Sequence, residues 1–323
     1  MLLKPQPLSQ NATVGVIAPS LPLIPAWRPA YESGLSTLRS LGFHVKEGRT
    51  IGLQRWWSAG TAQQQADDIN AMFADPEVKA IFALNGGFSA LAVLPYIDYE
   101  QVARNPKPFV GMSDITQYQL AMLGKTGLIG FHGNDVINGF GGHFSAAQPA
   151  WQQTILQTYR RLLMVNEPLG VLPRSAERTC WRPGSATGRL IGGNLKRITP
   201  LIGTSFFPAL DWFDGAILFW EEIGETLYDI TLNLHLLKHV GILERISGMI
   251  VGELTWVNQY FEEIEHPTPR EAILDTLSDF DFPILKVSDF GHNMTMLPLP
   301  MGVQATVDAE AQQVTILESA VSS

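Results

Sequence analysis

The first 167 residues alternate short runs of apolar residues with longer segments in which apolar residues recur at helical spacing. Such runs are typical of buried parallel strands, and the longer segments are typical of helices that cross over between them. This order predicts a doubly wound α/β domain, which binds ligands at the carboxyl ends of its strands. The expected strands are 13–18, 78–84, 108–112 and 128–131, and the expected helices are 26–41, 61–73, 89–97, 114–123 and 148–164.

The pattern changes after residue 167. Three prolines between 168 and 183 indicate an interdomain linker, and 184–323 mixes strands with few helices. We therefore expect an N-terminal domain at 1–167 and a smaller α+β domain at 184–323. The glycine-rich segment 138–143 is expected to be a flexible loop. In the second domain the expected strands are 188–190, 215–220, 248–251 and 304–317, and the expected helices are 226–239 and 269–278.

Composition restricts the partners. Charged residues make up 16% of the chain, against about 25% in typical domains, so we expect part of the surface to be covered in a homodimer. The net charge is −9 and no stretch is strongly basic. Binding to nucleic acid or to an anionic membrane is therefore disfavoured, because both need clusters of Lys and Arg.

Features of the chain favour the cytoplasm. Cys180 is the single cysteine, so no intrachain disulfide can form. Pro5 and Pro7 interrupt the start of the chain, which shows no signal-peptide pattern. No uncharged apolar run approaches the roughly 20 residues that span a bilayer.

Ser113 is the first candidate for chemistry. The segment GMSDIT (111–116) places it between a predicted strand and a predicted helix, with Gly111 two residues earlier. This arrangement is similar to a nucleophile elbow, which exposes a serine hydroxyl beside free helix N–H groups. The alternative is that Ser113 is only a helix N-cap, or that Asp114 and Gln117 form the cap.

Carboxylates and histidines supply further candidates. Glu221 and Glu222 directly follow an apolar strand, where burial without a partner would be costly, and His292 lies in a glycine-containing loop. Each could also be an ordinary surface residue. His235 and His239 have the spacing of a zinc-binding pair, but no third ligand or H-E-x-x-H motif accompanies them, so we expect no metal. The chain also lacks a G-x-G-x-x-G motif and a phosphate-binding loop, and we expect no organic cofactor.

Five short motifs occur in a characteristic order, namely GMSDIT (111–116), IGGNL (191–195), ILFWEEIGETLY (217–228), DFGHN (289–293) and LPLPMG (297–302), and the segment GVIAPS (15–20) precedes them. Together they resemble the LD-carboxypeptidase family, which includes the microcin immunity peptidases, over nearly the whole chain.

The resemblance implies a Ser-His-Glu triad spread over two domains. Ser113 would be the nucleophile, His292 the base and Glu221 the carboxylate that orients the base, with Glu222 beside it. His132 also matches a family position, where a supporting role is expected.

The family's oxyanion hole implies further residues. Backbone N–H groups of Gly86, Gly87 and Asp114 would stabilise the oxyanion. Many LD-carboxypeptidases have Arg-Gly-Gly-Tyr where this chain has Asn85-Gly-Gly-Phe88, and this departure bears on the substrate.

The resemblance also implies the substrate class. A murein tetrapeptide that loses its terminal D-Ala is the first expectation, and a microcin-type aminoacyl-sulfamoyl adenylate is the alternative. Trp56, Trp57 and Trp181 are candidates for stacking on its adenine. A non-catalytic two-lobed binding protein is the alternative from another class.

Overall fold

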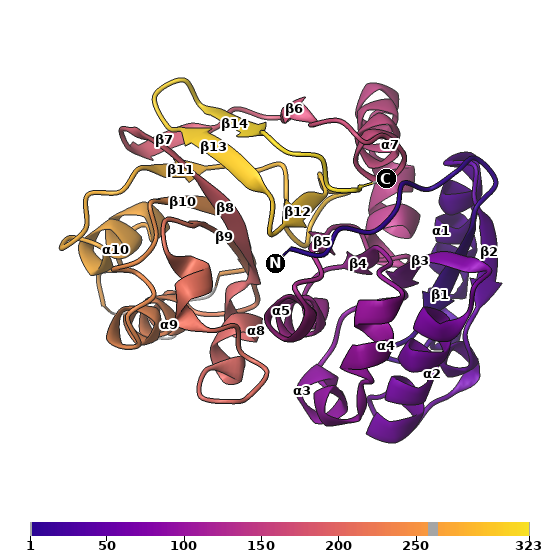
Figure 1. Ribbon diagram of the computed structural model, residues 1–323. Helices are drawn as coiled ribbons and strands as arrows, with labels where there is room; N and C mark the ends of the chain where they lie inside the picture. The colour runs from indigo at the N-terminus through magenta and orange to yellow at the C-terminus, as the bar shows by residue number, and fades with distance from the viewer. Residues whose placement is uncertain (1, 258–263, 323) are drawn as a thin grey trace.

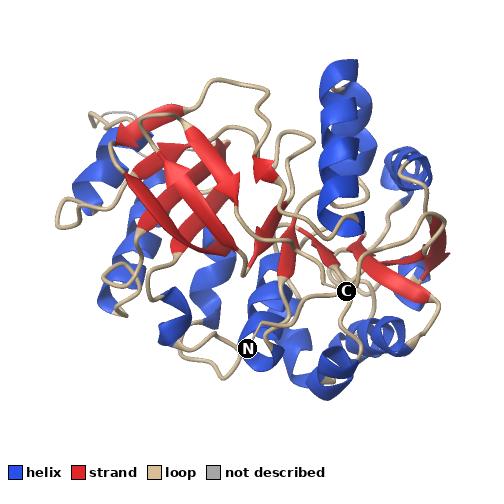
Figure 2. Cartoon of the chain, turned by 45° about the horizontal axis from the view of Figure 1, so that its top comes forward, coloured by secondary structure: helices blue, strands red, loops and turns tan. Residues whose placement is uncertain are grey.

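The computed structural model describes residues 2–257 and 264–322. Two β-sheets lie side by side, with helices packed around them, and helices α5 (Ile115–Thr126) and α8 (Leu195–Ile198) lie where the two halves meet (Figure 1). In Figure 2 one group of strands lies at the left and a second extends from the centre to the right, with helices around both. The molecule thus has the α/β half and the smaller α+β half that the sequence predicts.

The first sheet has the strand order β12-β5-β4-β3-β1-β2. All neighbours from β2 to β5 are parallel, as expected for strands joined by helices. Two strands of this sheet were not expected. One is β2, at the edge of the sheet, and the other is β12, which comes from the far end of the chain and pairs antiparallel with β5. The strands are β1 (Thr13–Ile17), β2 (His44–Glu47), β3 (Val78–Ala83), β4 (Phe109–Gly111), β5 (Gly130–His132) and β12 (Leu299–Met301).

Local sequence signals explain most helices of this half. Thr61 caps α2 in a capping box with Gln64. The helix expected at 89–97 ends at Val93 and continues as a short 3-10 turn around Pro95. The helices are α1 (Arg28–Ser40), α2 (Ala62–Ala74), α3 (Ala90–Val93), α4 (Tyr99–Arg104), α5 (Ile115–Thr126), α6 (Phe144–Ala146) and α7 (Pro149–Met164), with 3-10 turns at Pro25–Trp27, Arg49–Gly52 and Leu94–Tyr96.

The expectation of a flexible loop at 138–143 is wrong. Asn138–His143 forms a π-helical turn. The buried Asp135 holds its start, because this carboxylate accepts hydrogen bonds from the backbone N–H groups of Asn138 and Gly139 at 2.6 and 2.8 Å. A glycine-rich sequence is ordered here by side-chain acceptors that precede it.

The second sheet has the order β6-β14-β13-β8-β9-β10-β11-β7. Its four central strands are parallel, and its outer strands are antiparallel. Strands β6 and β7 come from 168–183, so the expected linker also supplies both edges of this sheet. The strands are β6 (Gly170–Val171), β7 (Thr179–Arg182), β8 (Ser185–Asn194), β9 (Ile217–Ile223), β10 (Gly248–Thr255), β11 (Ile284–Lys286), β13 (Gln304–Asp308) and β14 (Gln313–Ile316).

The strand expected at 304–317 is in fact a hairpin, since β13 and β14 pair antiparallel around a turn in which Gln312 has a φ of 55°. The helices of this half cover the sheet on the side seen at the lower left of Figure 1. They are α8 (Leu195–Ile198), α9 (Leu227–His239) and α10 (Pro269–Thr276), with 3-10 turns at Thr199–Leu201 and Leu210–Phe213.

Hydrogen bonds between the halves fix their relative position. The buried side chain of Asn134 accepts from the Met296 N–H at 2.8 Å and donates to the Thr295 hydroxyl at 3.1 Å. A further bond joins β8 to α5, because the Asn194 N–H donates to the Thr116 hydroxyl at 3.0 Å. The carboxyl ends of β4, β8 and β9 therefore face one shared region between the sheets.

Candidate active site

Ser113 occupies a sharp turn between β4 and α5. Its φ is 60°, a left-handed conformation that is costly for a residue with a side chain. Gly111 permits the turn, because a Cβ there would lie 2.9 Å from the Ile115 side chain. The N-cap position belongs to Asp114, and no side chain caps the helix. Ser113 is thus held in a strained elbow, and the N-cap alternative is wrong.

Asp114 ties this elbow to the neighbouring loop. Its buried carboxylate accepts hydrogen bonds from the Ser20 hydroxyl at 2.7 Å and from the N–H groups of Ser89 and Ala90, both at 2.9 Å. The expected capping pair of Asp114 and Gln117 does not form, because this carboxylate points toward α3 and the Gln117 amide donates to the Arg197 carbonyl. The backbone N–H of Asp114 is left free of any acceptor among the described residues.

Glu221 and His292 are in direct contact. The Nδ1 atom of His292 lies 2.6 Å from Oε2 of Glu221, and the glutamate is fully buried. Burial by itself would lower the pKa of His292, but the adjacent carboxylate raises it above its ordinary value. The His292 Nε2 atom has no hydrogen-bond partner among the described residues. This imidazole is therefore oriented by a carboxylate on one nitrogen and available on the other.

The loop before His292 is anchored by a buried ion pair. Asp289 Oδ2 lies 3.0 Å from Nη2 of Arg178, and both side chains are about 1% exposed. Gly291 has a φ of 147° and passes so close to β10 that a Cβ would lie 2.6 Å from the Cβ of Glu253. These contacts fix the direction from which the imidazole approaches Glu221.

Glu222 is on the opposite face of β9 from Glu221, and of the two it is the one that lines the cleft. Its carboxylate accepts from the Asn194 amide at 3.0 Å and from the N–H groups of Lys196 and Ile223 at 2.7 and 2.9 Å. Burial, with the charge of Glu221, raises the pKa of Glu222 to about 7. The two adjacent carboxylates thus point to opposite faces of the strand, as neighbouring side chains of a strand do, and have different partners.

His132 lies behind Glu221. Its Nε2 is 3.9 Å from Oε1 of Glu221, and the ring packs against Phe219 and Phe290. Burial lowers the pKa of His132 to about 4, although the carboxylate acts in the opposite direction. The neutral imidazole of His132 therefore lies near Oε1 of Glu221, while His292 is bound to Oε2.

A cleft of about 620 Å³ brings the expected residues together. Ser113, His292, Gly86 and Gly87 all line it, while Glu221 lies beneath His292. The tryptophans named from the sequence do not line this cleft. Its described lining is Leu21, Trp27, Asn85, Gly86, Gly87, Phe88, Ser113, Asp135, Asn138, His143, Asn194, Lys196, Arg197, Glu222, Ile223, Gly224, Glu225, Trp256, His292 and Asn293.

The Gly86-Gly87 loop lies against the serine. A Cβ on Gly86 would be 2.6 Å from the Cβ of Ser113, so only glycine allows this approach. The Gly86 N–H donates to the side-chain oxygen of Asn85 at 2.8 Å, whereas the Gly87 N–H has no acceptor in the described chain. Of the three expected oxyanion donors, Gly87 and Asp114 have free N–H groups and Gly86 does not.

Comparisons with known proteins agree with this geometry. Residues 14–133 match the model of the LD-carboxypeptidase N-terminal domain, and residues 187–307 match that of the C-terminal domain. A Bacillus subtilis protein described as a probable murein peptide carboxypeptidase is 32% identical over 99% of this chain and 95% of its own. The chain belongs to the LD-carboxypeptidase family. It is accordingly a hydrolase of the serine carboxypeptidase type.

Other similar proteins are named for immunity to a microcin. The microcin C7 self-immunity protein MccF of Escherichia coli is 26% identical over 97% of this chain and 95% of its own. The MccF-like protein of Bacillus anthracis has a crystal structure that matches with a TM-score of 0.85 at 27% identity, covering 98% of this chain and 99% of that one. MccF in complex with glutamyl sulfamoyl guanosine matches at 24% identity with a TM-score of 0.86, covering 99% of this chain and 100% of that one, which supports the fold alone.

Several cleft residues of this LD-carboxypeptidase were not expected from its sequence. Asn194, in the IGGNL motif, donates a hydrogen bond to Glu222 and accepts one from the Arg197 N–H at the start of α8. The two glycines of the motif were the sequence signal that could have pointed to this residue. Arg197 and Trp256 have no motif of their own. They reach the site only because α8 and the end of β10 meet the N-terminal half.

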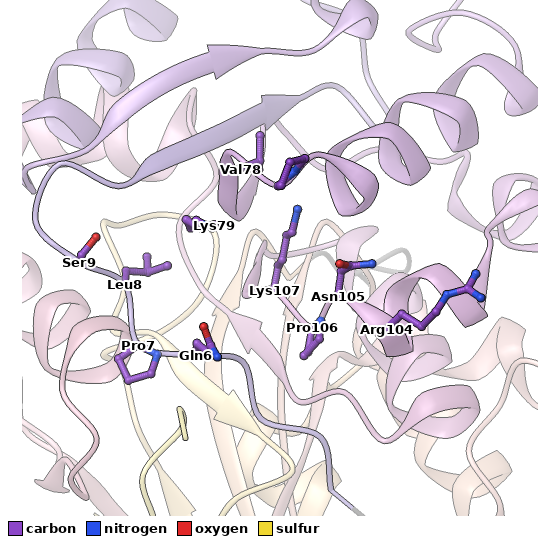
Figure 3. A pocket seen from close by; sticks show the side chains of 11 residues that line it. Gln6, Pro7, Leu8, Ser9, Val78, Lys79, Arg104, Asn105, Pro106 and Lys107 are labelled. Atoms are coloured by element: carbon purple, nitrogen blue, oxygen red, sulfur yellow. The ribbon is translucent and has the colours of Figure 1, made fainter. Parts of the chain in front are cut away.

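A second hollow, of about 470 Å³, contains no residue of this site. Figure 3 shows Lys107 among the side chains that line it. The Lys107 ammonium donates to the carbonyls of Met72 and Asp75 at 2.7 and 2.6 Å, so it completes the end of α2. The hollow has a structural cation in its wall and no catalytic group.

No group of three or more metal-ligating side chains occurs in the described residues, where His235 and His239 stack on each other along α9. Within the same residues, no helix is long and apolar enough to cross a membrane.

Proposed function

We propose that this LD-carboxypeptidase removes the terminal D-Ala of a murein tetrapeptide with Ser113 as nucleophile, His292 as base and Glu221 as the residue that orients the base. One observation carries the proposal: the imidazole is bound to a buried carboxylate through Nδ1, while its unpartnered Nε2 belongs to the same cleft as the strained serine. A serine hydroxyl needs such a base at neutral pH.

The reaction proceeds by acyl transfer. His292 Nε2 takes the proton of the Ser113 hydroxyl as its oxygen attacks the scissile carbonyl, and Glu221 stabilises the imidazolium that results. The imidazolium then protonates the leaving amine of D-Ala. A water molecule, deprotonated by the same imidazole, hydrolyses the acyl-enzyme and regenerates the serine.

The oxyanion hole follows from the free donors. Gly87 follows Gly86, which lies against Ser113, and Asp114 directly follows Ser113 in the chain. The backbone N–H groups of Gly87 and Asp114 both lack an acceptor in the described chain. We assign the developing oxyanion to these two groups. The N–H of Gly86 already donates to the Asn85 side chain, so it is not assigned to the oxyanion. Gly86 instead allows the loop to lie close to Ser113, because it has no Cβ.

In this proposal the triad residues come from both domains. Residues 1–167 would carry Ser113 and the oxyanion donors, 184–323 would carry Glu221 and His292, and 168–183 would connect them. The substrate would bind in the cleft between the domains.

A microcin-type substrate is the second candidate. Exposed aromatic side chains line the cleft, with Phe88 67% and Trp256 74% exposed, and Trp27 lines it as well. Flat rings of this kind suit a nucleobase. The relative MccF has been crystallised with aspartyl sulfamoyl adenosine, which gives the probe for this activity.

One assay separates these functions. Purified protein is incubated with murein tetrapeptide and, separately, with aspartyl sulfamoyl adenosine, and the release of D-Ala or aspartate is measured. We expect the tetrapeptide to have the higher kcat/KM. A preference for the adenosine compound would favour the immunity-type function, and hydrolysis of neither would contradict both. Labelling by a fluorophosphonate, lost in Ser113→Ala, distinguishes an enzyme from a non-catalytic binding protein.

We also propose a cytoplasmic homodimer. The low share of charged residues and the exposed apolar side chains, such as Leu232 at 67% exposure, support a covered face. Sedimentation at micromolar concentration should give about twice the chain mass of 35.6 kDa, and a species at the chain mass would contradict the dimer. Fractionation of cells of the source organism tests the location.

A further inference from the structure

Arg197 lies in the same cleft as Ser113 and is held from both halves of the molecule. Its guanidinium carbon is 4.7 Å from the centre of the Phe88 ring, and Phe88 directly follows the oxyanion donor Gly87. Its backbone is fixed as well, because the N–H donates to the Asn194 side chain at 3.2 Å and the carbonyl accepts from the Gln117 amide at 3.1 Å. The arginine is therefore positioned beside the start of α5, close to the nucleophile.

The other charges that line the cleft already have partners. The Lys196 ammonium is paired with Glu225. The carboxylates of Glu222 and Asp135 accept hydrogen bonds from neighbouring N–H groups. Among the described residues, Arg197 is the one lysine or arginine of the cleft with no carboxylate within 4.0 Å.

The stacking determines what this cation can bind. An aromatic ring occupies one face of the guanidinium and leaves the N–H donors along its edge free. A planar fork of donors matches a carboxylate, which it can bind through two parallel hydrogen bonds. Stacking also fixes the rotamer, so that less conformational entropy is lost on binding.

We propose that Arg197, oriented by Phe88, binds the terminal carboxylate of the substrate. The inference rests on the proposed function, in which the scissile bond joins the last residue to the peptide and the free carboxylate is only one residue away from Ser113. A carboxypeptidase must distinguish this carboxylate from a peptide bond, and Asn85 brings no charge to the neighbouring loop.

The test compares two substrates that differ at one group, namely murein tetrapeptide and the same peptide with a C-terminal amide. For wild type, Arg197→Gln and Arg197→Lys, kcat/KM is measured on both. Arg197→Gln should lower kcat/KM on the free acid by about 10- to 100-fold, the value of a hydrogen-bonded charge pair, and should change the amide reaction by less than about threefold. Arg197→Lys should recover part of the loss, because it keeps the charge without the fork.

Two further variants serve as controls. Arg39→Gln removes an exposed arginine of α1 that is not among the residues lining the cleft, and it should leave both reactions unchanged. Phe88→Leu removes the stacking ring and should raise KM for the free acid more than for the amide. Circular dichroism and the thermal midpoint establish that each variant is folded, and Arg197→Lys carries the test if Arg197→Gln is not.

The outcomes are distinct. Loss on the free acid with little change on the amide supports the assignment. Equal loss on both substrates overturns it while leaving the proposed function intact. If wild type hydrolyses neither peptide, the proposed function fails, and the carboxylate site is withdrawn with it.

Discussion

The Nδ1 atom of His292 lies 2.6 Å from Oε2 of Glu221, although 70 residues separate the two in the chain and they come from a loop and a strand end. The other carboxylate of the pair, Glu222, contacts backbone N–H groups of α8 and its own strand instead. This arrangement gives the two adjacent glutamates different expected contributions to catalysis.

We expect Glu221→Gln to lower kcat by up to about 10⁴-fold. The amide keeps the shape of the side chain but loses the charge that stabilises the imidazolium and selects the tautomer. Glu222→Gln should lower kcat by less than about tenfold, because Glu222 does not contact His292. Steady-state kinetics of both variants on the same substrate decide the matter, and the opposite ranking would transfer the triad role to Glu222.

Ser113→Ala should abolish turnover with little effect on stability. The Ser113 hydroxyl caps no helix, so its removal costs no capping hydrogen bond, while the reaction loses its nucleophile. Activity above a few per cent of wild type would exclude Ser113 from that role. The thermal midpoint, measured beside wild type, shows whether the variant keeps its fold.

The pH dependence of kcat/KM should reflect the pairing of His292. The base must be neutral, so activity falls as the pH falls through its pKa. Glu221, with smaller effects from Glu222 and Asp135, raises this pKa above the ordinary 6.5 despite burial. We therefore expect the acidic limb of wild type to have its midpoint above pH 6.5.

Glu221→Gln should move that midpoint to lower pH, because burial then acts on the imidazole without the opposing charge. A matched control is Glu225→Gln, which changes a cleft carboxylate that is bound to Lys196. Profiles measured from about pH 5 to about pH 9 for all three proteins provide the test. Identical midpoints in wild type and Glu221→Gln would mean that His292 is not the titrating base.

Most of the fold was predictable because buried parallel strands and amphipathic helices leave clear patterns in this sequence. Strand β12 was missed, since Leu299–Met301 is short, contains a proline and gains its pairing only from β5 of the other half. The order at 138–143 depends on Asp135, whose side chain supplies acceptors that no periodicity reveals.

The site was predictable only in part, for a similar reason. The candidates Ser113, Glu221 and His292 lie in recognisable motifs, whereas the stacking of Arg197 on Phe88 joins residues from different halves. Because side chains alternate along a strand, Glu221 and Glu222 point to opposite faces of β9. This alternation could not indicate which of them lines the cleft, because that depends on the position of α8 and of the His292 loop.

The last prediction concerns stability and Glu222. Its pKa in the folded protein is about 7, against an ordinary value of 4.5, because burial and the charge of Glu221 disfavour the ionised form. The folded state therefore holds this proton more tightly than the unfolded state. The stability that this proton contributes is fully present below pH 4.5 and is lost as the pH rises through 7. The difference of the two pKa values corresponds to at most about 3 kcal/mol.

Glu222→Gln stays neutral at every pH, so its free energy of unfolding should lack this decline. An amide accepts through one oxygen and cannot satisfy all three N–H donors that Glu222 binds, which lowers stability by an amount independent of pH. Relative to wild type, the variant should thus gain up to about 3 kcal/mol between pH 4.5 and pH 8. Urea denaturation at several pH values measures this difference, with the exposed Glu310→Gln as control. Parallel stability curves for wild type and Glu222→Gln would show that Glu222 ionises in the folded protein as it does in the unfolded chain.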